Sequence, residues 1–191
     1  MTLNRKRFLG VVLAVGLLGA ATGGAVGAMK KSQDARVVHA SWVDVYERPG
    51  AMVRDVDAIV VARFLGATPG RVATGSAGES IPFELAKFAV ERSLKGTSAA
   101  TVTVERVGGV AGGQQVVFES DGGSYTAGQR YVLFLKRQPG TGYYYLVNDQ
   151  GRYTVTPRGL APAAHHGAVA DRLRGASLAG LDALVARTLG R

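Results

Sequence analysis

The sequence of 191 residues contains no cysteine. Without cysteine the chain forms no disulfides, builds no thiolate zinc site and offers no thiol nucleophile for catalysis. It also lacks the cysteine that would carry the lipid of a bacterial lipoprotein. Any attachment to a membrane must therefore come from the polypeptide itself.

Acidic residues are scarce, and the formal net charge is +9. Three of the positive charges, Arg5, Lys6 and Arg7, belong to an N-terminal segment without acids, so a chain starting at Met29 carries +6. No five consecutive residues are all Lys or Arg, and the cations are interspersed with Asp and Glu. The sequence therefore contains no specific signal for nucleic-acid binding. General solubility and attraction to anionic envelope polymers or lipid both fit this charge.

Recognisable catalytic and cofactor motifs are also lacking. The run Gly70–Ser76 imitates a phosphate-binding loop, but Ser76 stands where the loop needs Lys. Gly108–Gly113 does not have the glycine spacing of a dinucleotide fingerprint. His165 and His166 are adjacent, so they point apart, and no acid lies at ligand spacing nearby. The sequence predicts no catalytic residues, no cofactor and no metal.

The N-terminus reads as an export signal. Asn4–Arg7 is basic, and the 22 residues from Phe8 to Met29 carry no charge. Val26-Gly-Ala28 offers small or tolerated residues at the two positions that a signal peptidase inspects, which fits cleavage after Ala28. The apolar length also suffices for an uncleaved anchor. Both readings stay open: residues 1–28 are a signal peptide or a signal anchor. The protein is expected to be secreted, or held at the cytoplasmic membrane by this hydrophobic helix with its domain outside.

Residues 29–50 predict a tether, within which Ser41–Tyr46 alternates like an edge strand or an entry turn. One or two helical turns are expected over 51–56. Residues 58–65 are apolar on both faces, as in a central strand. The following stretch, 66–80, is rich in Gly, Ala, Thr and Ser, and it predicts a mobile loop.

Residues 81–95 fit two structures. Read as a helix, the segment has Ser80 as cap and Gly96 as stop. Read as a strand, its alternation slips near Leu85–Ala86, as at a β-bulge. The strands on either side favour a bulged strand.

The remainder alternates apolar and polar residues in short runs separated by turn signals. Several strands at roughly 10–15-residue intervals indicate a sandwich or barrel. Residues 157–176 predict a linker, and Ser177 caps a C-terminal amphipathic helix over 177–191. The expected strands are 101–107, 116–118, 129–136, 143–148 and 152–156.

Four segments carry a resemblance: Asp57–Ala62, Val90–Gly96, Thr126–Leu135 and Tyr145–Val155. In this order they resemble exported bacterial domains with the OB-like barrel of tissue inhibitors of metalloproteinases and netrin modules. The resemblance implies a mainly β fold over 51–156, a small Greek-key barrel of about five to seven strands. Those inhibitors chelate zinc through an N-terminal Cys, so their mechanism does not carry over to this chain.

A candidate ligand face lies on the strand 143–148. If Tyr144 is buried, alternation leaves Tyr143 and Tyr145 exposed near Arg152, where they could stack on sugar or contact protein. Ordinary strand packing is the alternative. The strand acids Glu84, Glu91, Glu105 and Glu119 give no sign of converging as an acid/base pair.

The sequence therefore predicts an extracytoplasmic, non-enzymatic binding module whose partner is an envelope polymer or a protein. Two alternatives are a secreted hydrolase with a carboxylate pair and a protease-inhibitor-like module that lacks the Cys chelator. The membrane is a partner only through an uncleaved N-terminal segment.

Overall fold

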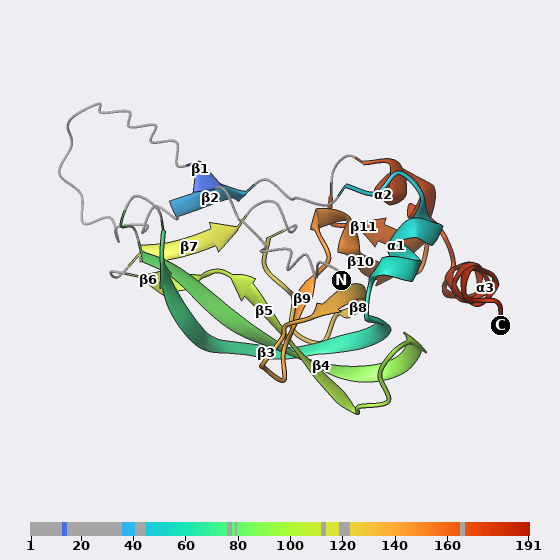
Figure 1. The fold of residues 1–191 in the computed structure, drawn as a ribbon, viewed down its shortest axis with the longest axis horizontal. Helices are drawn as coiled ribbons and strands as arrows, with labels where there is room; N and C mark the ends of the chain where they lie inside the picture. The colour runs from blue at the N-terminus through green and yellow to red at the C-terminus, as the bar shows by residue number, and fades with distance from the viewer. Residues whose placement is uncertain are drawn as a thin grey trace, which may run out of the picture.

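The structure is a computed structural model that describes residues 13–14, 36–40, 45–75, 78, 80–111, 114–118, 123–164 and 167–191. The chain is mainly β, with helices gathered at one end (Figure 1). The helices are α1 (Pro49–Asp55), α2 (Ala168–Leu173) and α3 (Leu178–Leu189), with a 3₁₀ turn, η2 (Asp149–Gly151). The strands are β1 (Leu13–Ala14), β2 (Arg36–Ala40), β3 (Ala58–Thr74), β4 (Ser80–Lys95), β5 (Thr101–Val107), β6 (Gly109–Ala111), β7 (Gln114–Phe118), β8 (Arg130–Arg137), β9 (Tyr144–Leu146), β10 (Arg152–Thr156) and β11 (Gly159–Pro162).

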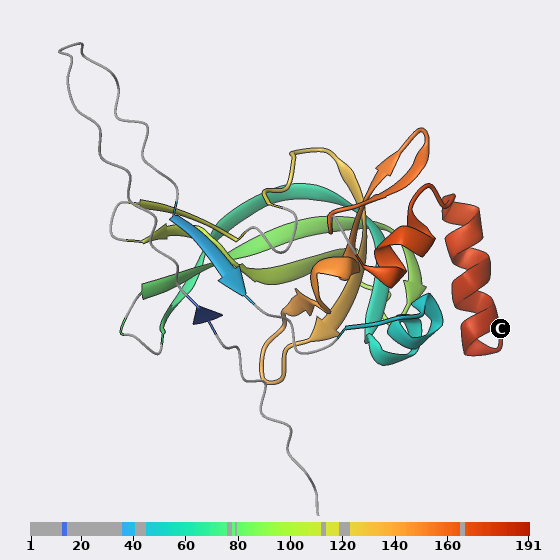
Figure 2. The same cartoon turned by 90° about the horizontal axis from the view of Figure 1, so that it is seen from above.

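The larger sheet has the order β11-β10-β8-β3-β4-β5-β9, and β9 also pairs with β8. The β8–β9 pairing is antiparallel and spans three residue pairs, beginning at Leu135 and Leu146. The β5–β9 link is a single parallel pair, Val104 with Tyr144. The sheet therefore curls back on itself without forming a clean barrel. A smaller sheet, β1-β2-β7-β6, lies at the end opposite the helices (Figure 2).

Residues 58–62 of β3 and the centre of β8 are buried on both faces, which explains their continuous apolar sequences. One face of each strand points into the curl of the sheet, and the other lies under the helices. As far as Phe64, the even-numbered residues of β3 pack inside, whereas Ile59 and Val61 pack against the helical layer. In β8 the inner residues are Tyr131, Leu133 and Leu135, and the outer ones are Val132 and Phe134.

Residues 81–95 form strand β4, as predicted, but its irregularities lie elsewhere than expected. Leu85 and Ala86 pair regularly with Thr68 and Ala67 of β3. Register shifts instead separate Ile59 from Val60, Val61 from Ala62, Phe64 from Gly66 and Pro69 from Val72. The strands bend at these points, because a bulge adds a residue to one strand and increases its local twist.

The segment Leu94-Lys95-Gly96, at the end of β4, contacts the end of helix α1 and the residues that follow it. The Lys95 ammonium donates to the carbonyl oxygens of Val53, Arg54 and Val56 at 2.8, 2.9 and 2.5 Å. These carbonyls lie in the last turn of α1 and just after it, where the carbonyls of a helix have no partner within the helix. Gly96 has φ +81°, and a Cβ there would lie 1.8 Å from the Asp57 carbonyl oxygen. Only glycine fits this close approach.

The loop between β3 and β4 is shorter than the one expected over 66–80. β3 continues to Thr74 and β4 begins at Ser80, so both strands extend into a long hairpin. The register shift between Pro69 and Val72 accommodates Pro and Gly within the pair. Cross-strand pairing therefore overrides the turn-like composition.

Two stretches near the C-terminus also differ from the expected linker over 157–176. β11 pairs with β10, and Leu160 is buried. Val169, Ala170 and Leu173 of α2 pack into the core beneath the helices. The C-terminal helix is confirmed as α3: the Ser177 side chain accepts a 3.0 Å hydrogen bond from the Gly180 amide.

Most of the predicted N-terminal hydrophobic helix lies outside the described residues, and Leu13–Ala14 form the short strand β1. Of the possible edge strand 41–46, only Val45 and Tyr46 are described, and neither is in a strand. His165 and His166 also lie outside the described residues. Within the part of the chain that is described, no helix has the length and apolar character needed to cross a membrane.

Candidate functional site

A hollow of about 360 Å³ lies on the outer face of the larger sheet, across β3, β4 and β5. We call it the outer groove, and its wall is mostly apolar. Its lining residues are Leu65, Gly66, Ala67, Thr68, Leu85, Lys87, Thr103 and Tyr143.

The register shift between Phe64 and Gly66 supplies the most exposed apolar side chain of the groove. Phe64 pairs with Phe88 and Gly66 pairs with Lys87, so Leu65 is the extra residue of a bulge. Phe64 stays in the inner core, whereas 52% of Leu65 is exposed. A bulge can re-aim a side chain in this way, and here it turns a leucine toward solvent.

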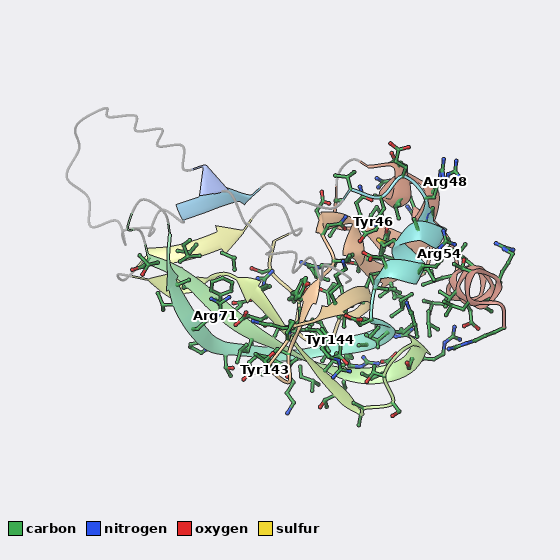
Figure 3. All side chains as sticks on the ribbon, in the orientation of Figure 1. Tyr46, Arg48, Arg54, Arg71, Tyr143 and Tyr144 are labelled. Carbon is green, nitrogen blue, oxygen red and sulfur yellow. The ribbon has the colours of Figure 1, made fainter. Side chains whose placement is uncertain are left out.

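Tyr143 closes the groove from the turn between β8 and β9 (Figure 3). Hydrogen bonds within the turn hold it in place. The Gln138 amide donates to the Tyr143 carbonyl at 3.0 Å, and the Tyr143 amide donates to the Thr141 hydroxyl at 3.1 Å. The half-buried Tyr143 ring is therefore presented from a fixed turn, with a flat apolar face and a hydroxyl.

Positive charge surrounds the groove. Lys87 is exposed on its wall, and no ion pair to Lys87 is found among the described residues. Along the same face Arg63 and Arg130 both bind Glu91, at 2.7 and 2.6 Å. Partial burial raises the pKa of Glu91, but hydrogen bonds from Arg130 and Arg63 outweigh it and hold the pKa below its ordinary value of 4.5. Glu91 thus stays ionised and neutralises only one of the two arginines.

A second hollow, of about 280 Å³, shares Ala67 and Thr68 with the outer groove and continues along the hairpin. Next to it Arg71 reaches across the sheet (Figure 3). Its guanidinium lies 3.9 Å from the Phe83 ring centre and donates to both carboxylate oxygens of Glu105, at 3.0 and 3.2 Å. This contact ties β3, β4 and β5 together, since each residue comes from a different strand.

Among the candidate ligand residues, Tyr143 lies on this surface and Arg152 does not. Arg152 is 4% exposed and lies 4.0 Å from the Tyr125 ring centre. It donates to the carbonyls of Gly123 and Ser124 at 2.7 and 2.9 Å, and so holds that loop over the core. Tyr145 is half-buried and pairs with Lys136 on β8. The structure therefore places Arg152 in the interior, apart from Tyr143.

Tyr144 is buried, and its hydroxyl accepts a 3.0 Å hydrogen bond from Arg137.

The described strand carboxylates are each held by arginine. Glu84 accepts from Arg106 at 2.5 Å, Glu105 binds Arg71, and Glu91 binds two arginines as above. Arginine thus occupies carboxylate oxygens of all three residues, and at Glu91 it also holds the pKa below its ordinary value. Glu119 lies outside the described residues. In the described part of the chain, no three His, Asp or Glu side chains gather as a metal site.

The sequence reasoning did not single out Leu65, Lys87 or Arg71. Leu65 belongs to the apolar run 58–65, which predicts a buried strand, and Arg71 lies within the expected loop 66–80. One local feature does indicate the bulge: Gly66 follows Leu65, and a glycine within a strand often marks a bulge.

Neither a scan against family models nor searches of curated proteins and of solved structures found a match to this chain.

Proposed function

We propose that this chain is an extracytoplasmic binding module, built on an OB-like barrel, that performs no chemistry of its own. The strand order supports the barrel: β3-β4-β5-β9-β8 leads back to β3, since β9 pairs with both β5 and β8. An OB fold is a five-stranded, partly open Greek-key barrel, which accommodates the narrow β5–β9 contact. The same proposal includes a structural relationship between this barrel and netrin-like domains.

The outer groove is the observation that carries the binding function. It combines an exposed leucine, an aromatic ring and a cation on one face of the sheet. Apolar surface with a few polar groups is the usual composition of a ligand site. An envelope polymer or a protein is the proposed ligand, and the positive charge favours an anionic one.

The two alternative functions have less support. A hydrolase needs one carboxyl to act as an acid, and the described strand carboxylates are engaged by arginine. A protease-inhibitor-like module would have to use the exposed end of the β3–β4 hairpin, because the chain has no cysteine to chelate zinc. A protease inhibition screen tests this second alternative.

Binding is tested with purified full-length chain and envelope fractions separated into cell-wall polymer and protein. We expect one fraction to retain the chain, and the double substitution Lys87→Ala, Tyr143→Ala to lower retention at least about tenfold. Arg158→Ala removes an exposed cation from the β10–β11 turn and should leave retention unchanged. Equal retention of all three proteins would show that the groove is not the binding site.

Export is tested by mass spectrometry of the N-terminus from fractionated cells. Either a mature chain beginning at Met29 outside the cytoplasm or an intact Met1 in the membrane fraction fits export. Recovery of the intact chain in the cytoplasm alone would contradict it.

A further inference from the structure

One edge of β3 is open beyond the point where β8 leaves it. β8 pairs with β3 as far as Arg63, opposite Arg130. One residue further, the Phe64 amide donates to the Gln129 carbonyl and the Gly128 amide donates to the Phe64 carbonyl, both at 3.0 Å. From residue 65 to Thr74, the only strand described beside β3 is β4. Alternate backbone groups along this edge therefore pair with no other strand in the described ranges, as at the edge of a sheet.

The open edge runs beside exposed apolar surface. Leu65 is 52% exposed and Val72 is 61% exposed, and both lie on this part of β3. The outer groove and the second hollow both border it, because Ala67 and Thr68 line the two. Backbone groups that seek hydrogen bonds thus lie next to hollows that can receive side chains. An added strand uses this combination: the edge gives affinity and the pockets give specificity.

The charges indicate what kind of chain fits. Lys87 on the groove wall is opposite Gly66, and Arg63 precedes Leu65 on the same strand. A second copy of this chain would bring the same cations to the surface it joins, and like charges on two surfaces that meet oppose association. Lys87 lies on β4, one strand in from the open edge, and Gly66 between Lys87 and that edge has no side chain, so an acidic side chain of the incoming segment can reach across toward Lys87.

We propose that the open edge of β3 takes up an extended segment of a partner protein as an added strand. The segment places an apolar side chain in the outer groove and an acidic side chain beside Lys87. Pro69 has no amide hydrogen and is followed by a register shift, so the paired stretch is short and centres on residues 65–68. This inference rests on the proposed binding function and names its partner class.

The test starts from a displayed library of random twelve-residue peptides, selected on the full-length chain in mild detergent. The selected consensus peptide is synthesised, and its affinity is measured by fluorescence anisotropy. We expect apolar residues at alternate positions of the consensus peptide, together with at least one acidic residue. The substitution Leu65→Glu in the chain should weaken binding of this peptide at least about tenfold. Val45→Glu is the matched control, since Val45 is 72% exposed but does not line the groove or the second hollow. The affinity of the peptide for the Val45→Glu variant should equal its affinity for the unaltered chain.

Backbone N-methylation of the peptide tests strand addition directly. A methyl group on an amide that faces β3 removes a hydrogen bond and clashes with the edge, whereas one on the next amide faces away. Affinity should fall about tenfold for alternate positions only, equivalent to losing about one hydrogen bond.

The remaining outcomes separate this inference from the proposed function. Binding that depends on Leu65 but not on the parity of methylation would leave the groove as a site and overturn strand addition. Retention by cell-wall polymer or by vesicles of anionic lipid, with no peptide selected, would overturn the peptide partner alone. A concentration-dependent dimer that Leu65→Glu abolishes, seen by sedimentation, would assign the edge to a second copy and overturn the inference. If neither peptide nor envelope material binds, both proposals fail.

Discussion

At the scale of single residues, Gly96 shows how a close backbone approach fixes an amino-acid type. Its positive φ and the nearby Asp57 carbonyl leave no space for a side chain. We expect Gly96→Ala to lower the free energy of unfolding by about 3 kcal/mol or more, because the strained φ and the backbone clash add. Urea denaturation measures this loss.

Gly140→Ala is the control for that substitution. Gly140 has φ +75°, but a Cβ there would meet nothing within 4 Å. Its loss should be about 1 kcal/mol, from the left-handed conformation alone. Equal losses at the two sites would contradict the steric role of the Asp57 carbonyl.

Glu91 and Asp149 predict opposite contributions to acid stability. The pKa of Glu91 is lower than 4.5 in the folded chain, so the unfolded chain binds its proton first as the pH falls. Its stabilisation is present above pH 4.5 and is lost as the pH drops toward the lowered folded pKa. Burial raises the pKa of Asp149 above 3.8, and its protonation therefore stabilises the folded chain as the pH falls.

Urea denaturation between pH 7 and pH 3 measures both effects. We expect Glu91→Gln to make the loss of stability with acid shallower, and Asp149→Asn to make it steeper. The same change of slope in both variants would show that at least one of the two carboxyls does not have the environment described above.

At the scale of elements, α3 holds the helical layer onto the outer face of the sheet. Leu181 is fully buried among residues of α1, α2 and the sheet. Leu181→Ala should lower the free energy of unfolding by about 2–4 kcal/mol, since the helix cannot collapse into the cavity. Asp182→Ala removes an exposed ion pair with Arg92 and should change stability by less than about 1 kcal/mol. Thermal or urea unfolding of the two variants distinguishes packing from charge.

The sequence predicted the elements whose pattern reflects their own burial. The apolar run of β8 and the alternation over residues 101–104 of β5 could be predicted, because there the polarity of each residue matches the face on which it lies. The length of the β3–β4 hairpin could not be predicted from the sequence. It is held by contacts of Arg71 with Phe83 and Glu105, which are far apart in the chain.

The candidate site was predicted only at Tyr143. Arg152 is usually a surface residue type, and its burial depends on two carbonyls of a distant loop and on the Tyr125 ring. Leu65 belongs to an apolar run, and only its bulged position exposes it. Such features follow from tertiary pairing and leave little local pattern.

At the scale of the whole molecule, the absence of cysteine makes the fold independent of redox conditions. The helices, the inner core and the outer groove are held by packing, hydrogen bonds and ion pairs alone. The chain needs no disulfide formation to fold, and its positive net charge opposes self-association.

The two-sided burial of the first part of β3 has a kinetic consequence. Amide protons over residues 58–62 lie between two neighbouring strands and are shielded on both faces, so they should exchange with deuterium only on global opening. Amides over residues 66–74 lie in the two-stranded hairpin and should exchange through local fraying. Mass spectrometry after deuterium labelling should therefore show one strand with a slow half and a fast half, and uniform exchange along β3 would contradict this. The fast half is the one we propose for binding, so occupation by a peptide would slow its exchange and make the whole strand behave as one unit.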